Sequence, residues 1–294
     1  MARGEHEPGF SSRTKEALTA YALLAPAMVA FVWFSFWPFY RLFHYALYQQ
    51  NQTGTRERYE GPSQLVDALT SSDFFQGVRV SVVLVVLAVP VGLVLGILLA
   101  TAAHRRLRGI KVFQTIFSST VASAAAVTAV VFYTLINPEI GYFKDVPWLD
   151  LNQSWSALIG ISLALVWQNL GLSFIIVLAG MQAIPDELIE AATLDGFGPI
   201  RRFFRLTLPL LSPTLLFLVV VLGVRAFQVY AEIEILTGGG PAGGTESLLF
   251  KITRLQQPRD LDTGAAYAIG LFGITMFVAL AQFGILNRRV HYGD

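Results

Sequence analysis

Residues 78–103 read VRVSVVLVVLAVPVGLVLGILLATAA, an apolar segment with a single charged residue, Arg79. A helix needs about 20 mainly apolar residues to cross a bilayer, so this segment predicts a transmembrane helix. Five other segments have the same character, and together they predict an all-α fold, a polytopic membrane bundle of about six transmembrane helices. The predicted spans are Ala17–Tyr40, Val78–Ala103, Val112–Ile136, Trp155–Met181, Leu210–Leu236 and Ala265–Leu286.

The composition of the whole chain supports membrane embedding. Hydrophobic residues make up 54% of the 294 residues, charged residues 14%, and the mean hydropathy is +0.56. Soluble domains are about 25% charged, because a folded soluble chain must cover its surface with polar groups. The net charge of +1 argues against a nucleic-acid partner. The absence of cysteine from the sequence excludes disulfides, iron–sulfur clusters and a thiol nucleophile.

The distribution of Lys and Arg predicts the orientation of the bundle. These residues concentrate in the N-terminal tail, loop 104–111, loop 182–209 and the C-terminal tail, so we expect both termini in the cytoplasm. The opposite side holds the polar loop 41–77, in which residues 63–76 are compatible with a short interfacial helix. The first span is too long for a cleaved signal peptide, whose apolar region is about 7–15 residues.

The sequence lacks the motifs of enzymes that act in membranes. It has no G-x-x-x-x-G-K-[ST] phosphate-binding loop, no H-E-x-x-H zinc site and no G-x-S-x-G nucleophile elbow. The predicted spans contain two carboxylates, Glu232 and Glu234, whereas proton-coupled carriers usually bury several acids. We therefore expect no catalytic residue and no metal site, and we expect that this chain hydrolyses no nucleotide.

Loop 182–209 has the start and stop signals of two short helices. Pro185 fits a first helical position, Gly196 a C-terminal stop, and Gly198-Pro199 a second start. The second helix carries Arg residues beside Phe203 and Phe204, and an exposed Phe pair is typical of a partner surface. The alternative is a solvated linker whose Phe side chains enter the lipid headgroups.

The same loop contains Glu190-Ala191-Ala192, three residues, Gly196, nine residues, and Leu206-x-Leu208-Pro209. This pattern resembles the EAA signature of binding-protein-dependent ABC importer permeases, the MetI-like or maltose-type family. The chain departs from the usual signature at Leu206, where isoleucine is usual. The resemblance covers about residues 75–290 and includes the segment Thr237-Gly-Gly-Gly-Pro.

The resemblance implies a type I ABC importer permease fold over residues 75–290, after a cytoplasmic tail (1–16) and a first helix with an outer loop (17–74). It implies that loop 182–209 docks on a separate ATPase, and that ATP and Mg²⁺ bind partner subunits while this chain holds no cofactor. The implied partners are a second homologous permease, two ATPase subunits and an external solute-binding protein, in a bacterial cytoplasmic membrane. The residues implied to couple to the ATPase are Glu190, Ala191, Ala192, Gly196, Leu208 and Pro209.

Within the family, residues 198–209 and Val290-His291-Tyr292 most resemble members that carry glycerol 3-phosphate or glycerophosphodiesters. Permeases for sugars share most of the same sequence pattern. Many sugar permeases have an aromatic–Asp pair where this chain has Tyr230-Ala231, so a role tied to that aspartate does not transfer. The resemblance thus implies a path for glycerol 3-phosphate, a glycerophosphodiester or a sugar.

Polar residues inside two spans mark a candidate solute path, because placing a polar group in a membrane helix costs free energy and usually serves a function. On the fifth predicted span Arg225, Gln228 and Glu232 share a helical face, and on the fourth Asn169 lies beside Gln168 at a similar depth. These five residues are predicted to line one cavity.

Each of these polar residues also has a structural interpretation. Asn169 and Gln168 are compatible with hydrogen bonds to a neighbouring helix. Arg225 is compatible with an ion pair to Glu232, or to an acid of the partner permease. Two other classes of function also remain open at this point: a stand-alone secondary carrier, and a membrane scaffold that docks a cytoplasmic partner.

Overall fold

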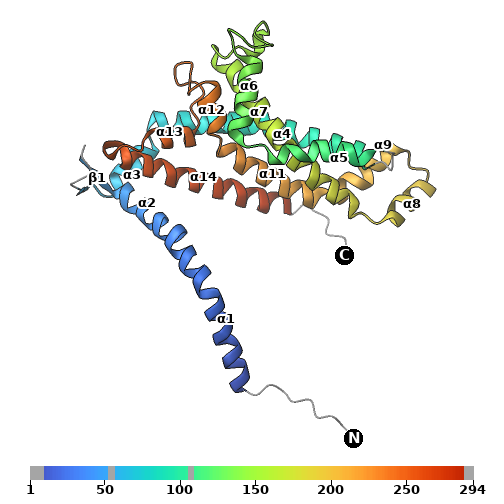
Figure 1. The fold of residues 1–294 in the computed structure, drawn as a ribbon, viewed down its shortest axis with the longest axis horizontal. Helices are drawn as coiled ribbons and strands as arrows, with labels where there is room; N and C mark the ends of the chain where they lie inside the picture. The colour runs from blue at the N-terminus through green and yellow to red at the C-terminus, as the bar shows by residue number, and fades with distance from the viewer. Residues whose placement is uncertain (1–9, 52–56, 105–108, 288–294) are drawn as a thin grey trace.

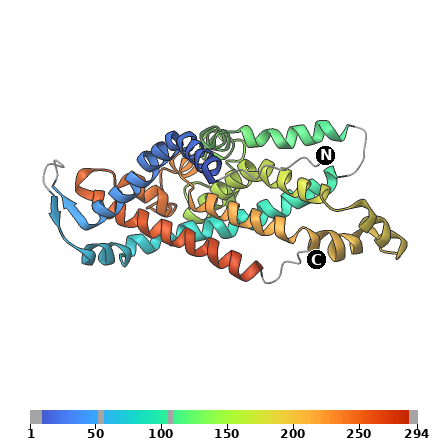
Figure 2. The same cartoon turned by 90° about the horizontal axis from the view of Figure 1, so that it is seen from below.

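The computed structural model describes residues 10–51, 57–104 and 109–287, and these are mostly helical (Figure 1). The long helices α4, α11 and α14 run side by side, with α8 and α9 at one end and a β-hairpin at the other (Figure 2). The helices are α1 (Phe10–Phe31), α2 (Trp37–Leu47), α3 (Pro62–Leu69), α4 (Ser72–Ala103), α5 (Ile110–Ser119), α6 (Ala125–Ile136), α7 (Ser154–Gln182), α8 (Asp186–Leu194), α9 (Pro199–Arg202), α10 (Leu208–Leu210), α11 (Ser212–Phe227), α12 (Ala231–Leu236), α13 (Leu248–Arg254) and α14 (Leu261–Asn287).

Shorter elements connect these helices. Strands β1 (Tyr48–Gln50) and β2 (Glu57–Tyr59) pair antiparallel, with Tyr48 opposite Tyr59. Two π-helical turns and three 3-10 turns complete the described secondary structure: the π turns are Val32–Phe36 and Phe203–Thr207, and the 3-10 turns are Thr120–Ala122, Pro147–Leu149 and Pro258–Asp260.

Helix α7 is the most enclosed of the long helices and packs closely along α4. A Cβ atom added at Gly96 of α4 would lie 2.6 Å from Cβ of Ser173, so the two backbones approach as closely as a glycine permits. Gly92, one turn earlier, has nothing within 4 Å of its Cβ position. The close approach of α4 to α7 here therefore depends on Gly96 and not on Gly92.

Four described helical segments are long and apolar enough to cross a membrane by themselves: Thr14–Leu47, Ser72–Ala103, Ser154–Gln182 and Pro258–Gln282. Two further spans are possible if each of two bent helix pairs counts as one crossing. The all-α, multi-pass fold predicted from the sequence is confirmed, whereas two of the predicted spans differ in form.

The third predicted span, Val112–Ile136, is not one helix. The chain bends by 103° between α5 and α6, with the break at Ser123–Ala124. The hydroxyls of Ser119 and Thr120 donate to the carbonyl groups of Ile116 and Phe117, three residues earlier, where the backbone tightens into a 3-10 turn. Such side-chain bonds compete with the helical ladder, which favours ending the helix there.

The fifth predicted span, Leu210–Leu236, was also wrong as a single helix. Its helix α11 begins at Ser212, after a 67° bend, and ends at Phe227. Residues 228–230 are not helical, and the chain resumes as the six-residue α12. This break lies beside the candidate solute path.

The first span projects away from the other helices (Figure 1). It runs from Thr14 to Leu47, and none of its most apolar window is buried by the rest of the chain. The predicted interfacial helix 63–76 is shorter than expected, because α3 ends at Leu69 and α4 begins at Ser72, capped by the Ser71 hydroxyl. Residues 1–9, most of the predicted tail, and Val290-His291-Tyr292 lie outside the described residues.

Candidate functional site

A cavity of about 310 Å³ lies where α7 meets the break between α11 and α12. It contains all five residues that the sequence placed on the solute path. The cavity is lined by Ala125, Leu165, Gln168, Asn169, Arg225, Gln228, Val229, Tyr230, Ala231 and Glu232.

Asn169 joins α7 to the end of α11. Its Oδ1 accepts a hydrogen bond from Nη1 of Arg225 at 3.3 Å, and its Nδ2 donates to the carbonyl of Leu165 at 2.9 Å. Asn169 itself is buried, whereas Arg225 is exposed in this chain. The bond to Asn169 uses one of the five N–H donors of the guanidinium.

Gln168 joins α7 to α12 on the other side of the same break. With its amide oriented to satisfy both neighbours, its nitrogen donates to Glu232 Oε1 at 2.7 Å, and its oxygen accepts from the backbone N–H of Ala125 at 3.3 Å. Ala125 is the first residue of α6, so one amide connects three elements. Glu232 is 2% exposed, so its buried carboxylate needs a hydrogen-bond partner within the protein, and the Gln168 amide supplies one.

The break itself has tertiary support. Ser247, which caps α13, donates its hydroxyl to the carbonyl of Val229 at 3.0 Å and accepts from the N–H of Phe250. The free carbonyl of the broken helix therefore has a buried partner. The one-face argument for Arg225, Gln228 and Glu232 was wrong, because the chain between them is not helical, although all three line the cavity.

The ion pair considered between Arg225 and Glu232 is not among the salt bridges of the described residues. Each of these side chains instead bonds an amide of α7, Arg225 to Asn169 and Glu232 to Gln168. Two neighbouring residues of one helix therefore hold the two sides of the break. The cavity offers amides, a guanidinium and a carboxylate to a polar solute.

At the C-terminal end of α7, loop 182–209 forms the two helices that its sequence predicts, α8 and α9. Helix α8 ends in a Schellman motif: the N–H of Phe197 donates to Ala192, and that of Gly196 donates to Thr193. Gly196 has φ +78°, a left-handed conformation that residues with a side chain resist. Pro185 precedes the first helical residue, Asp186, by one position.

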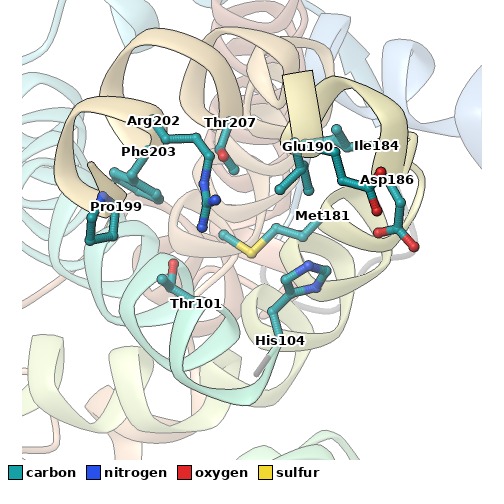
Figure 3. A pocket seen from close by; sticks show the side chains of 11 residues that line it. Thr101, His104, Met181, Ile184, Asp186, Glu190, Pro199, Arg202, Phe203 and Thr207 are labelled. Atoms are coloured by element: carbon teal, nitrogen blue, oxygen red, sulfur yellow. The ribbon is translucent and has the colours of Figure 1, made fainter. Parts of the chain in front are cut away.

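The second short helix is held against the first. Arg202 donates to the Thr193 hydroxyl at 2.9 Å, and the Arg201 guanidinium lies 4.4 Å above the Phe197 ring. A cavity of about 440 Å³ separates this pair from the ends of α4 and α7. Arg202 reaches into it from one side, and Asp186 and Glu190 lie on the other (Figure 3).

Proline often ends a helix, but Pro209 does not end the second short helix of this loop. The helix continues through a π turn, in which the N–H of Leu208 bonds the carbonyl of Phe203, and bends at Leu211. Proline lacks an N–H and its ring crowds the carbonyl four residues earlier, so a wider turn relieves it. The first span has the same arrangement, a π turn that ends at Phe36, two residues before Pro38.

Loop 182–209 exposes apolar side chains, but Phe203 and Phe204 are not both exposed as the sequence predicts. Phe204 is 61% exposed, whereas Phe203 packs against the apolar core between α4, α7 and α11. Leu194 and Ile200 are 88% and 74% exposed. Of the predicted coupling residues, Glu190, Ala191, Gly196 and Pro209 are exposed, Leu208 is half-buried and Ala192 is buried under the loop.

Sequence reasoning missed three contributors to the central cavity. Ala125 contributes a helix N-terminus, Tyr230 an exposed ring beside the break, and Ser247 the hydroxyl that supports the break. Ser247 has the local signature of an N-cap, but its second bond, to Val229 18 residues earlier, has no sequence signal.

These features together define a membrane permease. The chain is a multi-pass helix bundle with a polar cavity at a broken helix, and an ordered loop presents apolar side chains at one end. The chain belongs to the family described as binding-protein-dependent transport system inner membrane component, whose model matches residues 92–292.

The curated relatives span almost the whole chain. One is the sn-glycerol-3-phosphate transport system permease protein UgpA of Rhizobium meliloti, 33% identical, covering 93% of this chain and 96% of the relative. The protein of the same name from Yersinia pestis is 31% identical, covering 97% and 98%. This chain is therefore a permease subunit of an ATP-driven importer and not an enzyme, as the sequence predicts.

Solved structures show the same fold. A bacterial ABC transporter chain involved in import of the acidic polysaccharide alginate aligns with a TM-score of 0.79 at 22% identity, covering 96% of this chain and 99% of that one. A chain of the alginate transporter in complex with a pentasaccharide-bound periplasmic protein aligns with a TM-score of 0.81, also at 22% identity, covering 98% and 100%. The type I importer permease fold expected from the sequence is confirmed.

Proposed function

We propose that this permease carries a phosphate-bearing polyol, glycerol 3-phosphate or a glycerophosphodiester, through the cavity at the α11–α12 break. The observation that carries this proposal is Arg225, an exposed guanidinium in the cavity that Asn169 orients at 3.3 Å. A guanidinium suits phosphate because its N–H groups form a fork and it stays charged. The relatives named for sn-glycerol 3-phosphate support the same solute class.

The second candidate solute is a sugar, and the alginate transporters favour it. The amides of Gln168 and Gln228 and the ring of Tyr230 suit hydroxyl groups as well. A neutral sugar gains less from Arg225 than a phosphate does, since it carries no charge to pair with. Glycerol 3-phosphate and a neutral sugar therefore differ in what they require of Arg225.

Loop 182–209 would transmit the movement of separate ATPase subunits, which bind ATP and Mg²⁺. Its exposed Leu194, Ile200 and Phe204 supply an apolar surface for such a partner, and the Schellman motif at Gly196 fixes the angle between the two short helices. In the complete importer we place a second homologous permease, two ATPase subunits and an external solute-binding protein, with the bundle in a bacterial cytoplasmic membrane.

The experiment compares Arg225→Gln with the double variant Arg225→Gln/Glu232→Gln, and measures uptake of glycerol 3-phosphate and of a neutral disaccharide by the reconstituted importer. We expect both variants to lose at least about tenfold in apparent affinity for the phosphate, because a charge-assisted hydrogen bond contributes roughly 1.5–3 kcal/mol. Arg259→Gln is the matched control, since Arg259 is exposed and pairs with the adjacent Asp260. Restoration of phosphate uptake by the second mutation would remove Arg225 from the solute path.

A further inference from the structure

The two charged side chains that line the central cavity do not pair with each other. Arg225 and Glu232 line the same cavity of about 310 Å³, yet no ion pair between them is among the salt bridges of the described residues. Opposite charges attract strongly where little water is present, and charged side chains inside membrane proteins usually pair. The separation of these two charges therefore needs a physical cause.

The cause is a pair of amides on α7. Nη1 of Arg225 donates to Asn169 Oδ1 at 3.3 Å, and the amide nitrogen of Gln168 donates to Glu232 Oε1 at 2.7 Å. Consecutive Cα atoms lie about 3.8 Å apart, so the two contacts start from neighbouring points on one helix. Each charge is satisfied by its own amide, while the opposite charge lies in the same cavity.

The two charged side chains differ in what a solute can reach. Arg225 is exposed in this chain, whereas Glu232 is 2% exposed and is held at the buried wall of the cavity by Gln168. The guanidinium has N–H donors beyond the one that bonds Asn169. A phosphate in the cavity can therefore bond the cation, while the buried position of the carboxylate limits the repulsion between the two anions.

Glu232 also lies on a different helix from Arg225. The last backbone hydrogen bond of α11 is made by the N–H of Gln228, and the first of α12 is made by the N–H of Glu234. Residues 228–230 lie between the two helices and are not helical. Helix α12 can therefore turn relative to α11 without breaking the hydrogen bonds of either helix, and such a turn would change the distance between the carboxylate and the guanidinium.

We propose that Glu232 is a positioning residue for solute release: when α12 turns, its carboxylate leaves Gln168, pairs with Arg225 and takes the place of the solute phosphate on the guanidinium. The inference rests on the proposed function, because it takes a phosphate-bearing solute as the occupant of the cavity. Carboxylate and phosphate both bind the N–H fork of arginine, so they compete for it. The exchange lets a bound anion leave without exposing an unpaired guanidinium.

The test compares Glu232→Gln with Glu234→Gln. The first variant removes the charge and keeps a side chain of similar size that Gln168 can still bond. Glu234 is the matched control, since it is a carboxylate on the same helix. It is exposed, pairs with Arg254 of α13 at 3.1 Å, and lies outside the lining of the central cavity.

The first measurement reports release. It records the radiolabelled glycerol 3-phosphate that stays bound to the solubilised importer during ATP turnover, together with the maximal uptake rate in vesicles. We expect Glu232→Gln to retain several-fold more solute than the wild type and to lower the maximal rate several-fold at normal abundance. Glu234→Gln should match the wild type in both. An unchanged uptake rate, or a lowered rate without increased retention, would overturn the inference.

The second measurement asks whether Glu232 acts through Arg225. In Arg225→Gln the guanidinium for which the carboxylate competes is gone, so Arg225→Gln/Glu232→Gln should have the same maximal uptake rate as Arg225→Gln. A purely structural role of Glu232 predicts the same further loss of rate in both backgrounds, and that result would contradict the inference. If Glu232→Gln is not recovered from membranes, Glu232→Asp, whose charge sits on a shorter side chain with less reach, is tested by the same two criteria.

Failure of the proposed function gives a different result. The wild-type importer would then neither retain glycerol 3-phosphate nor take it up. Failure of the inference alone leaves wild-type uptake intact and changes only the response to Glu232→Gln.

Discussion

Arg225 and Asn169, 56 residues apart in the chain, are joined by a 3.3 Å hydrogen bond between the guanidinium and the amide oxygen. The bond fixes the depth at which α11 ends against α7. The neighbouring Gln168 bonds Glu232 just past the break, so consecutive residues of one helix hold both sides of a broken one. A solute that enters the cavity meets a guanidinium that is already oriented.

Asn169→Asp tests whether the charge of Arg225 is used for the solute. A carboxylate at this position would pair with the guanidinium and compete with a phosphate for it. We expect the apparent affinity for glycerol 3-phosphate to fall on the order of tenfold, with little change in abundance. Uptake kinetics measure the effect. Ser162→Ala on the same helix, which removes only a hydroxyl bonded to the carbonyl of Leu158, serves as the control. Unchanged affinity in Asn169→Asp would contradict a solute role for Arg225.

Gln168→Leu is expected to destabilise the bundle. It leaves the buried oxygens of Glu232 and the N–H of Ala125 without the amide that bonds both, at a cost of about 1–3 kcal/mol for an unsatisfied polar group. The thermal unfolding midpoint of the purified chain should fall. Gln168→Leu/Glu232→Leu removes the orphaned carboxylate and should recover part of the midpoint, and a double variant no more stable than the single one would argue against this contact.

Gly196→Val tests loop 182–209. At φ +78° a β-branched residue is strained, so the Schellman motif and the angle between α8 and α9 should be lost while the spans still insert. We expect normal abundance, lost import and weaker retention of the ATPase in pull-down. Gly198→Ala is the matched control, because Gly198 has φ −64° and nothing within 4 Å of its Cβ position. Import at the wild-type rate in Gly196→Val would show that this loop is not the coupler.

Gly96→Ala and Gly92→Ala form a matched pair on one helix. The methyl group at position 96 would meet Ser173 at 2.6 Å, whereas at position 92 it would meet no atom within 4 Å. Overpacking of this kind costs about 1–3 kcal/mol, so Gly96→Ala should lower the thermal midpoint and Gly92→Ala should not. Equal effects of the two substitutions on the thermal midpoint would mean that the close approach of α4 and α7 does not restrict the side chain at position 96.

The sequence predicted the parts of the fold that depend on local signals. Apolar segments of 20 or more residues determine which helices can cross a membrane, and Gly196 and Gly198-Pro199 determine where the short loop helices end and begin. These signals require no knowledge of neighbouring elements.

The break at residues 228–230 of the fifth span was not predicted, because its support is tertiary. No Gly or Pro marks residues 228–230, and the carbonyl of Val229 is satisfied by Ser247 from another helix. The five residues of the predicted solute path line one cavity, although Arg225, Gln228 and Glu232 do not share the face of one continuous helix. The partners of Arg225 and Glu232 also depend on packing: two amides of α7 separate the charges that sequence spacing suggested as a pair.

The most direct test of the account is uptake of radiolabelled glycerol 3-phosphate into vesicles that contain this permease with its partner permease and ATPase subunits. ATP is supplied at the face that carries loop 182–209, and loaded binding protein at the opposite face. The account predicts accumulation that requires both, and that Gly196→Val abolishes. Accumulation without ATP, driven by an ion gradient alone, would contradict it and make the chain a secondary carrier.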